Sequence, residues 1–243
     1  MEAIEIRGLT KSYKTRLAVD DLNLTVHDGE FFALLGQNGA GKTTTIKMLC
    51  CLAVPTSGDA LLYGDSIRDN ENAVKQKCNV SPQETAVAAK LNVRENLELM
   101  GQIYGLSKHD AKRRATELMT DLSLLDRQKD KAKSLSGGMQ RRLSIALALI
   151  SDPKILFLDE PTVGLDVRAR RELWNCIRAL KGRVTVVLTT HYMEEAEALC
   201  DRIAIMHEGK LRAVGTLDEL KEQTGLNSLE DIFLNLTDAE VEL

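Results

Sequence analysis

A glycine-rich segment at residues 36–44, which reads GQNGAGKTT, constrains this chain more than any other feature. It fits the pattern G-x-x-x-x-G-K-[ST], in which a tight loop wraps around phosphate groups. An apolar run, Phe31 to Leu35, comes directly before the loop, and a helical stretch, Thr44 to Leu52, follows it. This order predicts an α/β core with a phosphate-binding loop at the end of a strand buried on both faces.

The residue types in this loop suit a nucleoside triphosphate such as ATP. Glycines let the backbone N–H groups approach the phosphates closely, and the following helix directs the positive end of its dipole at them. Lys42 would place its charge on the β- and γ-phosphates, and the Thr43 hydroxyl would ligate Mg²⁺. The predicted nucleotide-binding residues of the loop are Gly36, Asn38, Gly39, Ala40, Gly41, Lys42, Thr43 and Thr44. Kinases, GTPases and many ATPases share this loop.

Two acids, Asp159 and Glu160, follow the apolar run Ile155 to Leu158. An acid at the carboxyl end of a parallel strand faces the ligand crevice of an α/β sheet. We expect Asp159 to hold Mg²⁺ and Glu160 to polarise the water that attacks the γ-phosphate. A kinase needs no second acid of this kind, so the pair favours a hydrolase.

Periodicity outlines the rest of the fold. Short strands alternate apolar and polar residues over the first 35 positions, which predicts a half-buried antiparallel sheet. Apolar runs at 155–158 and 184–188 each follow a helical stretch, which is typical of a parallel sheet. Residues 203–206 and 211–214 predict a closing hairpin. The predicted fold class is therefore α/β, with a parallel core sheet, an N-terminal antiparallel β subdomain and an inserted helical subdomain.

The predicted boundaries follow from the same patterns. The chain, 1–243, forms one domain. Strand signals stop between about Gln83 and Ser134, and helical periodicity at 95–104 and 111–125 places the inserted subdomain at 84–140. A second helical stretch, Asp218 to Leu236, is broken at Gly225 and predicts a small C-terminal appendage at 216–243.

Charge and hydropathy exclude several classes of protein. The formal net charge is −4, whereas a nucleic-acid-binding chain would carry a basic footprint, so we expect no nucleic-acid partner. No apolar run approaches the roughly 20 residues that span a bilayer. The start of the chain lacks the apolar core of a signal peptide. We therefore expect a cytoplasmic location.

A second potential anion site lies at residues 135–140, which read LSGGMQ and begin a helical stretch from Gln140 to Ile150. Ser136, Gly137 and Gly138 would free backbone N–H groups at a helix N-terminus, and Ser136 adds a hydroxyl. As a simple capping box the segment is poor, because no acid stands at the third helical position.

The LSGGMQ segment resembles the signature motif of ABC transporter nucleotide-binding domains, and the resemblance extends over nearly the whole chain. It implies that the signature, including Gln140, contacts nucleotide. It further implies that Tyr13 stacks on adenine and that Gln83 touches Mg²⁺ and senses a membrane partner. Asp166 resembles the D-loop acid, and His191 the switch histidine that contacts the γ-phosphate. Together with Glu160 and Lys42, His191 would complete the catalytic set.

The resemblance also implies how such a chain works. Two copies would meet head to tail, so that the phosphate loop of one and the signature of the other hold the same ATP. A separate transmembrane permease subunit would be driven by this closure, and the chain would lie on the inner face of the membrane. Residues 91–97, 104–106 and 229–237 resemble the bacterial branch that exports drugs, lipids or sodium. The alternative is an ABC-type ATPase without a membrane partner, of the iron–sulfur assembly type. A P-loop kinase accounts for neither LSGGMQ nor Glu160.

Overall fold

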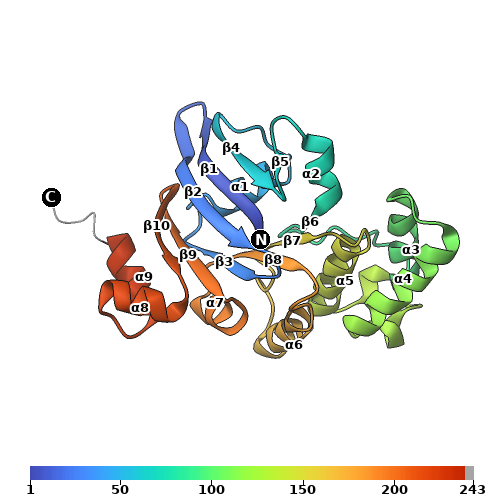
Figure 1. The fold of residues 1–243 in the computed structure, drawn as a ribbon. Coiled ribbons are helices and arrows are strands. Elements are labelled where there is room, and N and C mark those ends of the chain that lie inside the picture. The colour runs from blue at the N-terminus through green and yellow to red at the C-terminus, as the bar shows by residue number, and fades with distance from the viewer. Residues whose placement is uncertain (239–243) are drawn as a thin grey trace.

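The computed structural model describes residues 1–238 and contains two β-sheets with helices packed around them (Figure 1). The strands are β1 Glu2–Tyr13, β2 Arg16–His27, β3 Phe31–Leu35, β4 Ser57–Leu62, β5 Asp65–Ser66, β6 Cys78–Ser81, β7 Ile155–Asp159, β8 Thr185–Thr190, β9 Arg202–His207 and β10 Lys210–Gly215. The helices are α1 Lys42–Leu49, α2 Glu71–Lys77, α3 Val93–Ile103, α4 Lys108–Asp121, α5 Gly137–Leu149, α6 Val167–Arg178, α7 Met193–Leu199, α8 Leu217–Thr224 and α9 Leu229–Asp238.

The antiparallel N-terminal sheet has the order β2-β1-β4-β5, which confirms the predicted β layer. Strands β1 and β2 were predicted to be short, but each has 12 residues. Bulges in their pairing let the strands bend without ending. The strands β4, β5 and β6 and the helix α2 were not predicted from the sequence. The two-residue β5 and the four-residue β6 are too short to show a period.

The second sheet has the order β10-β9-β3-β8-β7-β6, and all its neighbouring strands are parallel except the final hairpin pair, β9 and β10. Strand β3 is buried along its whole length, as predicted. Phe31, Ala33 and Leu35 face the cluster formed with the helices, whereas Phe32 and Leu34 face the cluster formed with α1 and the N-terminal sheet. The parallel sheet is therefore the central layer between two cores.

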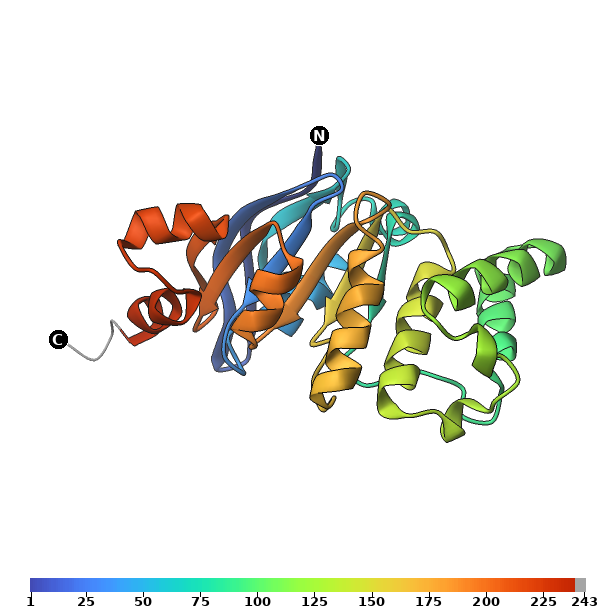
Figure 2. The same ribbon diagram turned by 90° about the horizontal axis from the view of Figure 1, so that it is seen from below.

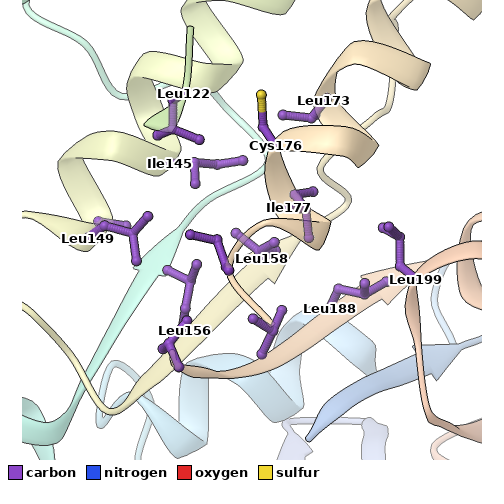
Figure 3. Packing of buried hydrophobic residues seen from close by; sticks show 14 of the residues in the cluster. Leu122, Ile145, Leu149, Leu156, Leu158, Leu173, Cys176, Ile177, Leu188 and Leu199 are labelled. Carbon is purple, nitrogen blue, oxygen red and sulfur yellow. The ribbon is translucent and has the colours of Figure 1, made fainter. Parts of the chain in front are cut away.

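Helices α5, α6 and α7 cover one face of this central sheet. In Figure 3, Leu158 of β7 lies near Ile177 of α6, and Leu156 and Ile145 belong to the same buried cluster. Helices α3 and α4 pack on each other and on α5, away from the N-terminal sheet (Figures 1 and 2). The proposed subdomain boundary at residue 140 falls within the first turn of α5, so this helix runs from the helical region into the core.

Helix ends differ from the predicted ones where local capping decides them. Helix α1 stops at Leu49 instead of Leu52, because Cys51 adopts a left-handed conformation with φ 55°. Helix α5 starts at Gly137 instead of Gln140, because Ser136 caps it by accepting a bond from the backbone of Met139. Helix α3 begins earlier than predicted, since Asn92 forms a capping box with Glu95.

The C-terminal helices α8 and α9 pack on each other and on β10 (Figure 2). Gly225 ends α8 in a left-handed conformation, as the predicted break requires. Residues 239–243 of the proposed appendage at 216–243 lie outside the described residues. None of the helices within residues 1–238 is long and apolar enough to cross a bilayer.

Candidate active site

The glycine-rich loop connects the end of β3 to the start of α1, as predicted. A Cβ atom at Gly36 would lie 2.5 Å from the carbonyl oxygen of Met206, and one at Gly41 would lie 2.5 Å from that of Ala18. Gly41 also has φ 103°, which L side chains rarely adopt. The neighbouring strands therefore require glycine at both positions, independently of any phosphate.

Lys42 is the first residue of α1, and its side chain is only 5% exposed. Its Nζ atom donates to the carbonyl oxygens of Gly36 at 2.7 Å and Gln37 at 3.1 Å. The same atom lies 3.0 Å from Glu160 Oε1. The ammonium group is thus fixed over the loop and in contact with the carboxylate predicted to activate water.

Asp159 ends β7 and faces the loop. Its Oδ1 atom accepts hydrogen bonds from Thr43 Oγ1 at 3.0 Å and from Thr189 Oγ1 at 2.6 Å. Adjacent hydroxyl and carboxylate oxygens are the donors that Mg²⁺ prefers. The role of Thr189 was not predicted, because a threonine inside an apolar strand has no distinguishing sequence pattern.

Glu160 lies between two basic side chains. Its Oε1 contacts Lys42 and its Oε2 contacts His191 Nδ1 at 2.6 Å. The backbone of Glu160 has φ 48°, unusual for a residue other than glycine, and its N–H donates to both the carbonyl and the hydroxyl of Thr189. Local strain of this kind gathers at functional sites, where the surrounding contacts hold it in place.

The loop opens into a cleft of about 330 Å³. It is lined by Tyr13, Arg16, Ala18, Asn38, Gly39, Gly41, Lys42, Thr43, Thr44, Gln83 and Glu160. Tyr13 stands 46% exposed at the rim, as an adenine-stacking residue would. Within residues 1–238, no residue of the LSGGMQ segment lines this cleft.

Arg141 connects the segment after β7 to the segment after β6, a role that was not predicted from the sequence. It is 4% exposed, and its guanidinium donates to the carbonyl oxygens of Asp159, Glu160 and Pro161 at 2.6 to 2.8 Å. It also donates to the carbonyls of Pro82 and Gln83. Burial lowers the pKa of Arg141, but a guanidinium stays protonated in proteins. The one sequence feature that could have pointed to this role is the position of Arg141 directly after the LSGGMQ segment.

The signature begins α5 on the exposed surface. Ser136 and Gly137 are exposed, and Ser136 Oγ accepts from the Met139 N–H at 3.4 Å. The Gln140 side chain turns inward and donates to the carbonyls of Ala132 and Leu135 at 3.2 Å each. The predicted D-loop acid caps α6, because Asp166 Oδ1 accepts from the Ala169 N–H at 2.9 Å.

Gly138 lets α5 approach α6 closely. A Cβ atom there would lie 3.0 Å from Ala169 Cβ, whereas one at Gly137 would meet nothing closer than 3.8 Å. Gly138→Ala is therefore expected to destabilise the fold by about 1 kcal/mol, because the overpacking outweighs the gain in helix propensity. Gly137→Ala is the matched control and should not destabilise it. Thermal unfolding without nucleotide checks both, and equal melting temperatures would contradict the packing role.

Comparison with known proteins decides the family. Residues 19–163 match the ABC transporter family. The chain belongs to the ABC transporter family. It is an ATP-binding subunit of this type and an ATPase, with the α/β fold expected.

Relatives of this ABC subunit include drug-resistance proteins. It is 44% identical over 239 residues to the daunorubicin/doxorubicin resistance ATP-binding protein DrrA of Streptomyces peucetius, covering 98% of this chain and 72% of that one. It is 40% identical to the linearmycin resistance ATP-binding protein of Bacillus subtilis, covering 91% and 72%.

Solved structures share the fold. An ATP-binding subunit of an ABC transporter superposes with a TM-score of 0.85 at 31% identity, covering 96% of this chain and 99% of that one. A dimeric cassette in a post-hydrolysis state, bound to ADP and phosphate, superposes with a TM-score of 0.78 at 27% identity, covering 88% and 98%.

Proposed function

We propose that this ABC subunit is the motor of a transporter that works as a homodimer around two MgATP and drives a separate membrane subunit, for export. The observation that carries the proposal is the position of Glu160, held between Lys42 and His191 at the phosphate-loop cleft. A carboxylate in this place is suited to accept a proton from an attacking water. Phosphoryl transfer then depends on positioning and on neutralising charge.

Each side chain of the site has a distinct task in this scheme. The triphosphate draws Lys42 onto its β- and γ-phosphates, which releases Glu160 Oε1 to bind the water. His191 keeps the other carboxylate oxygen oriented through its 2.6 Å contact and faces the γ-phosphate. Tyr13 stacks on the base at the rim of the cleft, with Lys11 Nζ 4.9 Å from its ring centroid.

The oxygen donors of the site fit Mg²⁺. Thr43 and Asp159, whose oxygens lie 3.0 Å apart, would hold the ion, and Gln83 would approach it from the cleft wall. When bound, Mg²⁺ supplies positive charge to the phosphate oxygens during transfer. Thr189 orients the Asp159 carboxylate for this role through its hydroxyl.

A homodimer would complete a site that one chain leaves half built. The exposed Ser136 and Gly137 lie outside the cleft that holds the phosphate loop. Two exposed apolar residues, Val163 and Val167, flank the D-loop acid Asp166, as at a surface that another chain covers. A solved relative with this fold is dimeric and holds ADP and phosphate.

The dimer is tested by measuring the mass of Glu160→Gln in solution with and without MgATP. We expect a doubling of mass only with MgATP, because blocked hydrolysis retains the nucleotide that bridges the copies. The matched control adds Gly137→Asp, whose carboxylate would repel the γ-phosphate of the partner copy without crowding its own chain. It should stay monomeric. A Glu160→Gln protein that is monomeric at saturating MgATP contradicts the proposal.

The membrane partner and the direction of transport rest on other observations. Exposed apolar side chains occur on α3, at Leu99 and Ile103, and after α1, at Leu52 and Val54, and they suit a docking subunit. Relatives named for drug resistance support export and a location on the inner face of the membrane. Affinity capture from solubilised membranes should recover a polytopic protein. Capture of iron–sulfur scaffold proteins instead would favour the alternative ATPase.

A further inference from the structure

Glu195 is a buried acid that does not line the phosphate-loop cleft. It lies on α7 and is 0% exposed. Its Oε1 atom accepts a hydrogen bond from Trp174 Nε1 of α6 at 3.1 Å. Its Oε2 atom is buried and makes no hydrogen bond of normal geometry. A fully buried carboxyl with one unpaired oxygen is costly, so it calls for an explanation.

Two threonine hydroxyls face this carboxyl, and they flank the active site. Thr162 and Thr190 both contact the Glu195 side chain. Thr162 follows Glu160 by two positions, and Thr190 directly precedes His191. The Thr190 hydroxyl accepts from the Tyr192 N–H at 2.9 Å, so its own hydrogen is free to point at Glu195. Glu195 thus bridges the two segments whose side chains meet in the Glu160–His191 contact.

Burial has the largest effect on the Glu195 pKa and outweighs the hydrogen bonds from Thr190, Trp174 and Thr162, which favour the charged form. Burial raises the pKa of Glu195, and the nearby negative charge of Glu160 raises it further. Arg141 is the nearby cation, but its N–H groups donate to backbone carbonyls and not to Glu195. The thiol of Cys200, a half-buried residue, is a further titratable neighbour. A protonated carboxyl can donate from Oε2, and Thr162 Oγ1 is a buried acceptor that also lacks a partner of normal geometry.

We propose that Glu195 is a positioning residue that holds the loop after Glu160 and the segment carrying His191 in register. It touches neither nucleotide nor the attacking water, and its effect passes through Thr162 and Thr190. The inference rests on the proposed roles of Glu160 and His191. If it holds, a neutral amide of the same shape replaces the acid, whereas a shorter acid does not.

The test compares Glu195→Gln, Glu195→Asp and Glu195→Ala by steady-state phosphate release from the purified full chain. We expect Glu195→Gln to keep kcat within about twofold of the wild type, since the amide retains one donor and one acceptor. Glu195→Asp and Glu195→Ala should lower kcat by about tenfold with little change in KM, because a lost positioning contact acts on the reacting geometry rather than on binding. Glu197→Gln, an exposed acid on the same helix, is the matched control and should match the wild type.

The pH dependence of the melting temperature gives a second test, because a purely packing role would not depend on pH. An acid with a raised folded pKa contributes full stability below its unfolded pKa and loses it as pH rises through the folded pKa. The melting temperature of the wild type, relative to Glu195→Gln, should therefore fall as the pH rises above the ordinary pKa of a glutamate. A difference that stays constant with pH would contradict the raised pKa expected of a carboxyl buried against Trp174, Thr162 and Thr190.

The outcomes separate this inference from the proposed function. If Glu195→Gln is inactive or unfolded, or if a folded Glu195→Ala keeps the wild-type kcat, the positioning role is wrong. A wild type that hydrolyses ATP and a Glu160→Gln variant that does not would leave the proposed role of Glu160 standing in either case. If Glu160→Gln hydrolyses ATP normally, both ideas fall.

Discussion

Glu160→Gln is expected to lower kcat for ATP hydrolysis by about 100-fold or more, because a general base contributes that much to proton transfer. The amide cannot accept a proton from water, yet it keeps the shape of the side chain. ATP binding should persist, since the loop backbone and Lys42 remain. In the variant, Lys42 also loses its carboxylate contact of 3.0 Å, which leaves the ammonium free for phosphate. Phosphate release measures hydrolysis, and titration calorimetry with MgATP measures binding.

Glu194→Gln is the matched control for this loss. Glu194 is an exposed acid three positions after His191, and its nearest basic partner, Arg170, lies 4.0 Å away. Its loss should leave kcat near the wild-type value, because an exposed ion pair of this length contributes little. Glu160→Gln with more than about a tenth of wild-type kcat would show that another group takes the proton.

Arg141→Met is expected to lower the free energy of unfolding by about 3 kcal/mol or more, because it leaves several buried carbonyls without their donor. Methionine has similar length and suits an apolar site, so the change removes the hydrogen bonds with little change in volume. Arg141 ties the strand end at Asp159 and Glu160 to the carbonyl of Gln83. The variant should also lose ATPase activity where it still folds. Urea unfolding followed by circular dichroism measures the stability.

The adjacent Arg142→Met provides the comparison. Arg142 is also buried, but its hydrogen bonds to Leu122 and Ser123 measure 3.4 Å, and its ion pair to Glu172 measures 3.7 Å. Replacing Arg142 should lower the free energy of unfolding clearly less than replacing Arg141, and phosphate release should change little. If the two variants unfold at the same urea concentration, the network around Arg141 contributes nothing special to the fold.

Much of the fold was predictable because local patterns encode it. The loop at 36–44, the buried run at 31–35 and the final hairpin follow from spacing and hydropathy, and all three are present. Helix ends were predicted less well. Ser136, Asn92 and the left-handed Cys51 set them through single side-chain or backbone contacts that periodicity does not register.

The residues of the site were predictable from the sequence, but the contacts between them were not. The residue types of Lys42, Thr43, Asp159 and Glu160 were predictable from their order along the chain. Their mutual contacts depend on β3, β7 and β8 lying side by side, which places residues more than 100 positions apart within 3.0 Å. The prediction that Ser136 to Gln140 and Asp166 contact nucleotide remains a prediction, since it concerns a second copy.

By itself, the sequence determined the glycine-rich loop, the paired acids and the signature, because each is a short run whose chemistry depends on adjacent residues. Only the tertiary structure decided that Lys42 and His191 contact opposite oxygens of Glu160, that Arg141 donates to the backbone of the same loop, and that Glu195 lies beside Thr162 and Thr190. Those contacts join separate strands and helices. Burial and strand order create them, and neither can be read from the spacing of residues along the chain.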